Sequence, residues 1–349
     1  MSLFWADALT SKQALLFSLL HRELTRRGHE LLITCREYDY VVKLLRLKGI
    51  TPKVIGKYGG SALSSKLGAS LKRELVLVRE LSDLKPSAHV SFTSPEGSRA
   101  AFKMQIPILL LTDSPHSVYV NSLTIPLANT VIVPEATPPE EYGPYFRLVR
   151  FRVFKGVFEA MWAKRLMPSK ALLDSLGLEP FTYVVFRTEE SKASYYPLRG
   201  HRAPTAITPL VRMVVEEGLK AVVFARYPDQ EKALEAEFKG RILIPRDAVD
   251  GLSLAYYALA VVSGGSTMAT EAALVGTPGI TLFPKEIHIV KYLSKKGFPL
   301  YNLRMEEASN KLKDIIDKGE GSKVDTTDKL ATLEDPMEAI IRTLEEVAT

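Results

Sequence analysis

Residues Ala258–Phe283 read ALAVVSGGSTMATEAALVGTPGITLF, and this stretch decides the fold of the chain. It opens with a short apolar run, Ala258–Val262, which predicts a buried parallel strand. The strand is followed by five small residues, namely Ser263, Gly264, Gly265, Ser266 and Thr267. Such residues predict a tight turn whose backbone amides can approach an anion closely.

A helix follows the turn. Met268–Val275 has helix-forming composition with Thr267 as the expected N-cap, and Gly276 is placed to end the helix. Pro278 then leads into a second apolar strand, Gly279–Phe283. Unpaired amides and the helix dipole both favour an anion at a glycine turn before a helix, so the stretch predicts a phosphate site.

Glu271 falls in the first turns of this helix. A carboxylate there would repel a phosphate that it touched, but it can accept hydrogen bonds from a ribose diol further out. The same pattern also fits a βαβ unit whose turn is glycine-rich only because it is tight. No lysine follows the glycines, and this argues against a P-loop of the Walker type.

The spacing Ser-Gly-Gly, Glu271, Gly276 and Pro278 resembles the donor-nucleotide loop of glycosyltransferase-B fold proteins. These include the MurG-type N-acetylglucosaminyltransferases and the UDP-N-acetylglucosamine 2-epimerases. The chain as a whole is more similar to the family called domain of unknown function 354. The matching stretches are Arg26–Glu30, Gly56–Gly60, Val249–Ser253 and Gly265–Pro278.

The resemblance implies two Rossmann-like βαβ domains that face each other across a cleft. It also implies that the glycine loop contacts the diphosphate and that Glu271 contacts the ribose of a nucleotide sugar. We therefore expect an acceptor-side domain over residues 1–150 and a nucleotide-sugar-binding domain over 151–330. The final residues, 331–349, are expected to form a helix that returns to the first domain.

The composition is that of an ordinary globular protein, with 46% hydrophobic and 25% charged residues in 349. The single cysteine, Cys35, excludes an internal disulfide, and the amino terminus lacks the layout of a signal peptide. A cytoplasmic protein is the expectation, and the scarcity of Cys, Asn and Gln fits a thermophilic source. The six histidines are scattered, so we expect a site without a metal and no cofactor other than the UDP-sugar donor.

The net charge of +6 is carried by the first part of the chain. Residues 1–160 hold 21 Lys and Arg against 14 Asp and Glu, whereas the remainder is close to neutral. A basic half suggests an anionic acceptor or a phospholipid surface, although a solvated basic surface would look the same. Nucleic-acid binding is not expected, because no recognised module is present.

The first half alternates strands and helices with short turns, which predicts a parallel sheet covered on both faces. Strands are expected at Leu3–Ala8, Leu31–Thr34, Pro52–Ile55, Ala88–Phe92, Pro107–Leu111 and Thr130–Val133. The segment Ser61–Leu84 predicts an amphipathic helix with a basic side formed by Lys66, Lys72, Arg73 and Arg79. This helix either lies on a membrane or presents a solvated face.

Ligands of such sheets lie beyond the carboxyl ends of the strands, where several chemically useful side chains are predicted to meet. In the second half, Arg187 and Arg226 end two strands and suit phosphate, although surface ion pairs are an alternative. Lys291 and Tyr292 are candidates for sugar contact or for simple packing.

The first half is expected to supply the general base of a glycosyl transfer, with His116, Asp113 and Asp7 as candidates. Resemblance to the 2-epimerases is weaker at the residues that move protons. Thr93 stands where a carboxylate belongs, and Phe186 stands where a histidine belongs. The favoured hypothesis is therefore metal-independent glycosyl transfer from a UDP-sugar. A UDP-sugar epimerase or hydrolase and a non-catalytic nucleotide-sugar-binding scaffold are the alternatives.

Overall fold

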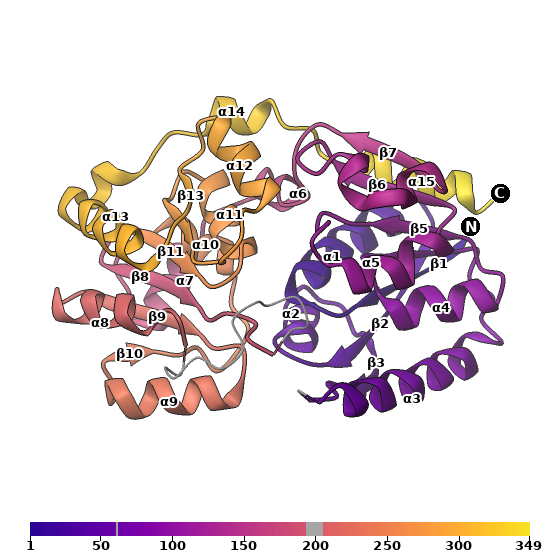
Figure 1. Cartoon of the computed structure of the whole chain (residues 1–349), viewed down its shortest axis with the longest axis horizontal. Coiled ribbons are helices and arrows are strands. Elements are labelled where there is room, and N and C mark those ends of the chain that lie inside the picture. Colours follow the sequence, from indigo (N-terminus) through magenta and orange to yellow (C-terminus); the bar gives the residue numbers. More distant parts are fainter. Residues whose placement is uncertain (61, 193–204) are drawn as a thin grey trace. The chain divides into compact units, whose positions relative to one another are not determined.

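The computed structural model describes residues 1–60, 62–192 and 205–349, and it divides the chain into two compact units. Unit 1 comprises Met1–Met161 together with Glu334–Thr349, and unit 2 comprises Trp162–Leu333. Each unit is an α/β layer structure around its own parallel sheet, as Figure 1 shows. The short helix α6 (Ala160–Ala163) contains the boundary between them.

Unit 1 holds a seven-stranded sheet in the order β3-β2-β1-β4-β5-β6-β7. Its strands are β1 (Leu3–Ala8), β2 (Glu30–Glu37), β3 (Lys53–Lys57), β4 (Ala88–Ser91), β5 (Ile108–Leu111), β6 (Thr130–Pro134) and β7 (Arg150–Phe154). Its helices are α1 (Ser11–Arg26), α2 (Val41–Leu47), α3 (Leu63–Leu81), α4 (Pro95–Lys103), α5 (Val118–Thr124) and α15 (Met337–Val347). The 3₁₀ segments are Ile125–Leu127 and Pro139–Arg147.

The last strand, β7, was not expected from the sequence, in which Thr130–Val133 was the final strand of the first half. It pairs in parallel with β6 from Thr130 beside Arg150 to Pro134 beside Phe154. The pairing takes unit 1 past residue 150, where a domain boundary was expected.

Unit 2 repeats the arrangement in a six-stranded sheet of order β10-β9-β8-β11-β12-β13. Its strands are β8 (Tyr183–Arg187), β9 (Lys220–Phe224), β10 (Ile242–Leu243), β11 (Ala260–Ser263), β12 (Gly279–Thr281) and β13 (Leu300–Asn302). Its helices are α7 (Lys170–Leu176), α8 (Thr208–Glu216), α9 (Pro228–Phe238), α10 (Gly251–Tyr256), α11 (Thr267–Leu274), α12 (His288–Lys295), α13 (Met305–Lys318) and α14 (Thr327–Ala331), and Gly319–Ser322 is a 3₁₀ turn.

The cores form because the central strands bury both of their faces. Alternate residues of β8, β9 and β11 pack in one cluster with helix residues such as Leu210 of α8, Leu234 of α9 and Leu312 of α13. In unit 1, Trp5 and Ile108 of the sheet pack against Leu77 of α3 and Ala100 of α4. The helices α3, α4 and α5 lie side by side on this face, whereas α15 packs on α1 and on β4 to β6.

The polar centre of unit 1 is an ion pair that the sequence did not predict. Arg73 was expected on the basic side of a surface helix, but its side chain is 3% exposed and faces the sheet. Its guanidinium donates two hydrogen bonds to Asp7 of β1, at 2.5 and 2.9 Å, and its Nε donates to the Ile55 carbonyl at 2.9 Å. The basic side of α3 is therefore smaller than predicted.

His89, on β4, is buried beside this pair and stacks on Trp5 with 3.9 Å between ring centroids. Burial lowers the pKa of His89 from 6.5 to about 4. The unfolded chain therefore takes up a proton at this residue before the folded chain does. The contribution of neutral His89 to the free energy of unfolding is therefore complete above pH 6.5 and should be lost as the pH falls through about 4.

We expect His89 to lower the free energy of unfolding by about 3 kcal/mol as the pH falls from 6.5 to 4. Urea unfolding at several pH values in this range measures the loss. The comparison is with His89→Leu, in which the slope of stability against pH between 6.5 and 4 should be smaller. Equal slopes in the two proteins would show that His89 is not responsible.

Candidate functional site

The glycine turn lies at the carboxyl edge of the sheet of unit 2, between its central strands. The Gly264 amide donates to the Arg187 carbonyl at the end of β8, and the Leu282 amide donates to the Ser263 carbonyl, both at 2.9 Å. The turn is thus anchored on both sides by the strands that neighbour β11. The following helix, α11, starts at Thr267.

The two glycines of the turn have different roles. A Cβ on Gly264 would lie 2.4 Å from the Cβ of Glu189, so only glycine lets the loop after β8 pass this closely. A Cβ on Gly265 would meet no atom of residues 1–60, 62–192 and 205–349 within 4 Å. Gly264 is therefore required by packing, whereas the backbone at Gly265 is open to a ligand.

The amino terminus of α11 has the features of an anion site. The prediction that Thr267 is the N-cap is wrong, because Ser266 occupies that position and Thr267 is the first helical residue. Ser266 makes no side-chain cap bond, and its carbonyl accepts from the Thr270 amide at 2.8 Å. Thr267 and Met268 come before Thr270 in the first turn of the helix, so their backbone amides lie at the positive end of the helix dipole.

Glu271 lies one turn further along α11 and is 6% exposed. Its Oε1 accepts a hydrogen bond from the indole Nε1 of Trp162 at 2.9 Å. Because both side chains are buried, the carboxylate is held in one orientation. Trp162 had no signal in the sequence that would have marked it as a partner of Glu271.

Of the two predicted arginines, Arg187 is the last residue of β8, and Arg226 lies two residues after the end of the neighbouring strand β9. Arg187 is buried, and its Nη1 donates to the Ala225 carbonyl at 3.3 Å. Arg226 lies 3.7 Å from a carboxylate oxygen of Glu190. The structure therefore brings both to the edge that carries the glycine turn, and each guanidinium also has a protein partner there.

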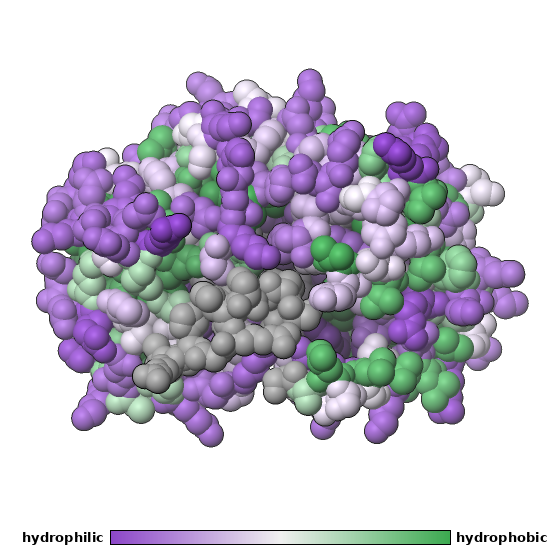
Figure 2. Space-filling model, in the orientation of Figure 1, coloured by the Kyte–Doolittle hydropathy of each residue, from purple (hydrophilic) through white to green (hydrophobic). Residues whose placement is uncertain are grey.

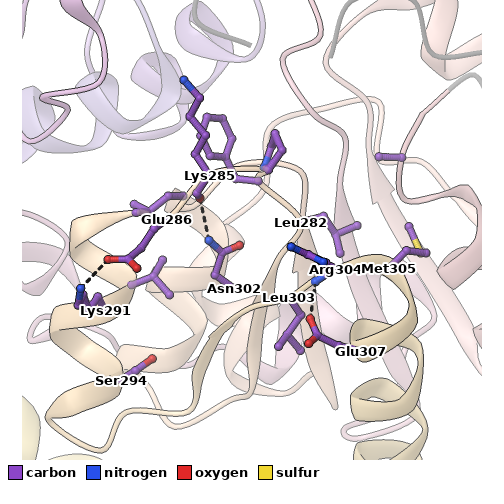
Figure 3. A pocket seen from close by; sticks show the side chains of 15 residues that line it. Leu282, Lys285, Glu286, Lys291, Ser294, Asn302, Leu303, Arg304, Met305 and Glu307 are labelled. Atoms are coloured by element: carbon purple, nitrogen blue, oxygen red, sulfur yellow. Dashed lines mark hydrogen bonds and ion pairs between the residues drawn. The ribbon is translucent and has the colours of Figure 1, made fainter. Parts of the chain in front are cut away.

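A pocket of about 660 Å³ opens at the carboxyl ends of β12 and β13, next to β11 (Figure 3). It is lined by the loop Phe283–Ile287, by α12 and by the start of α13. Lys291 lines it and pairs with Glu286 at 2.7 Å, and the Asn302 amide donates to the Lys285 carbonyl at 2.8 Å.

Lys291 was a candidate from the sequence, and its side chain does border this pocket. Lys285, Asn302 and Arg304 also line it, and no sequence pattern marked them as candidates. They come from the loop after β12 and from the end of β13 with the residues that follow it, and these segments meet only because β13 pairs with β12, with Asn302 beside Thr281. The pocket thus presents three basic side chains and two carboxylates, Glu286 and Glu307.

Unit 1 places three charged groups at the carboxyl edge of its own sheet. Lys12, from the first turn of α1, contacts both the Asp113 carboxylate after β5 and the Glu159 Oε1 after β7, the latter at 2.6 Å. The aromatic rings of Phe92 and Phe158 lie 5.3 and 5.9 Å from the Lys12 ammonium.

This cluster shifts the proton affinities of its members. Burial would lower the pKa of Lys12, but the two carboxylates raise it above its ordinary value. Burial raises the pKa of Glu159, and the nearby Asp113 charge adds to the rise in spite of Lys12. Glu159 Oε2 is buried and makes no hydrogen bond to any described residue. A buried carboxyl group with a raised pKa is a candidate proton acceptor.

The residues predicted as bases in unit 1 lie in different environments. Asp7 is fully buried, and its carboxylate accepts from Arg73, Ser94 and Thr34. Burial would raise its pKa, but Arg73 and these hydrogen bonds lower it. Asp7 is therefore placed in a structural ion pair that keeps it ionised.

Asp113 and His116 lie on the turn after β5. Asp113 is buried, with Oδ2 at Lys12 and Oδ1 accepting from the Ser114 hydroxyl at 3.0 Å. His116 is exposed three residues later. The Asp113 carboxylate is thus engaged by Lys12 and by Ser114.

Two parallel α/β units, one with a glycine turn before a helix at its sheet edge, define the glycosyltransferase-B fold. Solved structures agree. The UDP-GlcNAc 2-epimerase of Neisseria meningitidis, bound to UDP-GlcNAc, has a TM-score of 0.70 at 16% identity, over 99% of this chain and 100% of that one. MurG of Acinetobacter baumannii has a TM-score of 0.52 at 14% identity, over 99% of both chains.

The chain belongs to the family described as Protein of unknown function (DUF354), whose model matches residues 3–349. The uncharacterized protein MJ0665 of Methanocaldococcus jannaschii is 27% identical over 328 residues, which span 91% of this chain and 92% of that protein. The expected family and fold class are therefore confirmed.

Proposed function

We propose that the protein binds a UDP-sugar on unit 2 and transfers its glycosyl group to an acceptor without a metal ion. The observation that carries the proposal is the amino terminus of α11, where the open backbone at Gly265 and the amides of Thr267 and Met268 favour a diphosphate. Glu271, fixed by Trp162, is assigned to the ribose hydroxyls.

The neighbouring pocket is assigned to the sugar. Its volume of about 660 Å³ suits a hexose, and it is lined by hydrogen-bonding side chains of both charges. The pocket residues follow Thr281 of β12, and Thr281 is the register partner of Ser263, where the glycine turn starts. A donor with its diphosphate at α11 and its sugar at this pocket would therefore follow one sheet edge.

We assign the general base of the transfer to unit 1. Its charged cluster holds Glu159, whose raised pKa suits proton uptake from an acceptor hydroxyl, and Asp113, which was predicted from the sequence. Lys12 would hold the two carboxylates in place. His116 remains a second candidate because it is exposed on the adjoining turn.

The donor site is tested by thermal unfolding with UDP, other nucleoside diphosphates and their sugars. A ligand at about a hundred times its dissociation constant should stabilise the fold by roughly 2.7 kcal/mol. Glu271→Ala removes a hydrogen-bonding carboxylate and should weaken UDP binding by about ten- to a hundredfold. Gly265→Ala should also weaken binding, because its new methyl group stands where the diphosphate would approach.

The control is Lys232→Ala, an exposed substitution on α9 that should leave the ligand-induced shift unchanged. The apo protein carrying Gly265→Ala should melt within a few degrees of wild type, since its Cβ has open space. No stabilisation by any nucleotide would rule out the donor site.

An epimerase or hydrolase is the second candidate, because Lys12, Asp113 and Glu159 supply more proton-transfer groups than the sequence suggested. A labelled UDP-sugar distinguishes the three hypotheses. Label transferred to an extract component indicates a transferase, and conversion of the donor alone indicates an epimerase or hydrolase. Binding without either product indicates a scaffold.

A further inference from the structure

The outer face of α3 carries a row of leucines that are exposed among the residues the structure describes. Leu63, Leu67, Leu71 and Leu75 follow one another at intervals of four residues and are 50% to 68% exposed. Residues four apart on a helix lie on the same side, so these side chains form a continuous apolar strip. Figure 2 shows it as a green band at the lower right, where Figure 1 places α3.

The helix does not need this strip for its own packing. Its opposite side holds α3 on the sheet through Arg73, Leu77 and Leu81, which are all buried. The apolar and exposed side chains therefore require a reason outside the core of unit 1. Scattered exposed leucines are ordinary, but an ordered row of four is typical of an interaction surface.

The charges beside the strip are all positive. Lys72 and Arg79 are exposed on the outer side of α3. The two carboxylates of the helix point elsewhere, because Glu74 pairs with Arg99 at 2.8 Å and Glu80 pairs with Lys53. Beyond the helix end, Asp83 is offset by Lys85.

The neighbouring helices α4 and α5 also expose apolar side chains. The exposed face of α4 adds Phe102 and Lys103, and α5 adds Val118, Tyr119 and Leu123 without any charged residue. Because α3 packs beside α4 and α4 beside α5, these side chains belong to one helix layer of unit 1.

We propose that the outer face of α3 is a docking surface for an anionic phospholipid membrane. The leucines would insert at the level of the headgroups while Lys72 and Arg79 contact lipid phosphates. This would be peripheral attachment, since no helix among the described residues has the length and hydropathy needed to span a bilayer. The proposal stands independently of the proposed nucleotide-sugar chemistry.

Charge favours a lipid surface over a second copy of the chain. Two copies of α3 packed face to face would bring the four cations of the pair together, with no carboxylate on the face to balance them. An anionic membrane offers an apolar layer and negative phosphates in the arrangement that the strip and its cations complement.

The test is co-sedimentation of the full chain with vesicles of phosphatidylcholine alone and with equal parts of phosphatidylcholine and phosphatidylglycerol. We expect binding to the anionic vesicles that weakens as salt is added. Lys72→Gln with Arg79→Gln should reduce the partition coefficient by about fivefold per cation. Leu67→Gln, Leu71→Gln and Leu75→Gln together should reduce it at least about tenfold. Glutamine keeps the helix propensity of these exposed positions.

Matched controls use exposed residues elsewhere on the chain. Leu47→Gln, Leu148→Gln and Met167→Gln remove three other exposed apolar side chains. Lys170→Gln with Lys232→Gln removes two other exposed cations. All variants should keep the melting temperature of wild type within a few degrees, and both control sets should keep full vesicle binding.

Three results would overturn the proposal. The first is a wild-type protein that stays in the supernatant with anionic vesicles, as expected if the strip serves a protein partner. The second is vesicle binding that the α3 variants leave unchanged. The third is a wild-type dimer, seen by sedimentation velocity, that fails to bind vesicles and dissociates when the three leucines are replaced. Retained UDP binding in the α3 variants would show that the donor site is separate.

Discussion

Arg73→Leu should lower the free energy of unfolding by about 3 to 5 kcal/mol. The substitution removes the guanidinium that donates two hydrogen bonds to Asp7 and one to the Ile55 carbonyl. Asp7 would remain fully buried with an uncompensated charge, which its contacts with Ser94 and Thr34 satisfy only in part. Urea unfolding of wild type and variant at neutral pH measures the difference.

The matched control is Arg79→Leu, which replaces an exposed arginine on the same helix and should change stability by at most about 0.5 kcal/mol. The double variant Asp7→Leu with Arg73→Leu should recover part of the loss, because no lone charge then remains buried. A cost for Arg73→Leu as small as that for Arg79→Leu would contradict the assignment of this pair to the core.

Glu159→Gln should reduce turnover of the activated donor by about a hundredfold to ten-thousandfold, the range expected for loss of a general base. The carboxyl group that burial makes basic is replaced by an amide of the same shape, which cannot take up a proton. UDP binding should be unchanged, because the donor is assigned to unit 2. Steady-state kinetics with the donor and acceptor found by product analysis measure kcat, and thermal shifts measure binding.

Glu189→Gln serves as the control for a buried carboxylate with a structural partner, since Glu189 accepts from the Thr205 hydroxyl at 2.5 Å. It should affect stability more than kcat at saturating donor. The pH dependence adds a second readout, because kcat of wild type should rise through the pKa of Glu159 and that rise should be absent from Glu159→Gln. An unchanged pH profile in the variant would assign the base to Asp113 or His116.

The layer structure and the glycine turn could be predicted because they depend on local signals. The apolar runs and short turns of the first half predicted β1 at Leu3–Ala8, and the structure has the same bounds. Thr10 caps α1 by accepting a hydrogen bond from the Gln13 amide, three residues along the chain. Gly276 ends α11 with a φ of 87°, a conformation that glycine adopts without strain. Each of these depends on residues a few positions apart.

Sequence patterns did not predict the contacts that join distant segments of the chain. Arg73 looked like part of a basic helix side, and only its position opposite Asp7, 66 residues away, shows it to be buried. The strand β7 is only five residues long, too short for its alternation of Arg150 and Arg152 with apolar residues to predict a strand, and it is recognised by pairing with β6.

Some features of the candidate site also followed from local sequence, whereas others depended on contacts between distant segments. The sequence by itself determined the glycine turn, the place of Glu271 in the helix that follows it and the fold class, because strand, glycine turn and helix follow one another in 26 residues of chain. Only the tertiary structure decided that Trp162 orients Glu271 and that Lys12 joins Asp113 to Glu159, 147 residues away from the lysine. Side chains so far apart in sequence meet because parallel strands bring their carboxyl ends to one edge, and burial there then sets their charges.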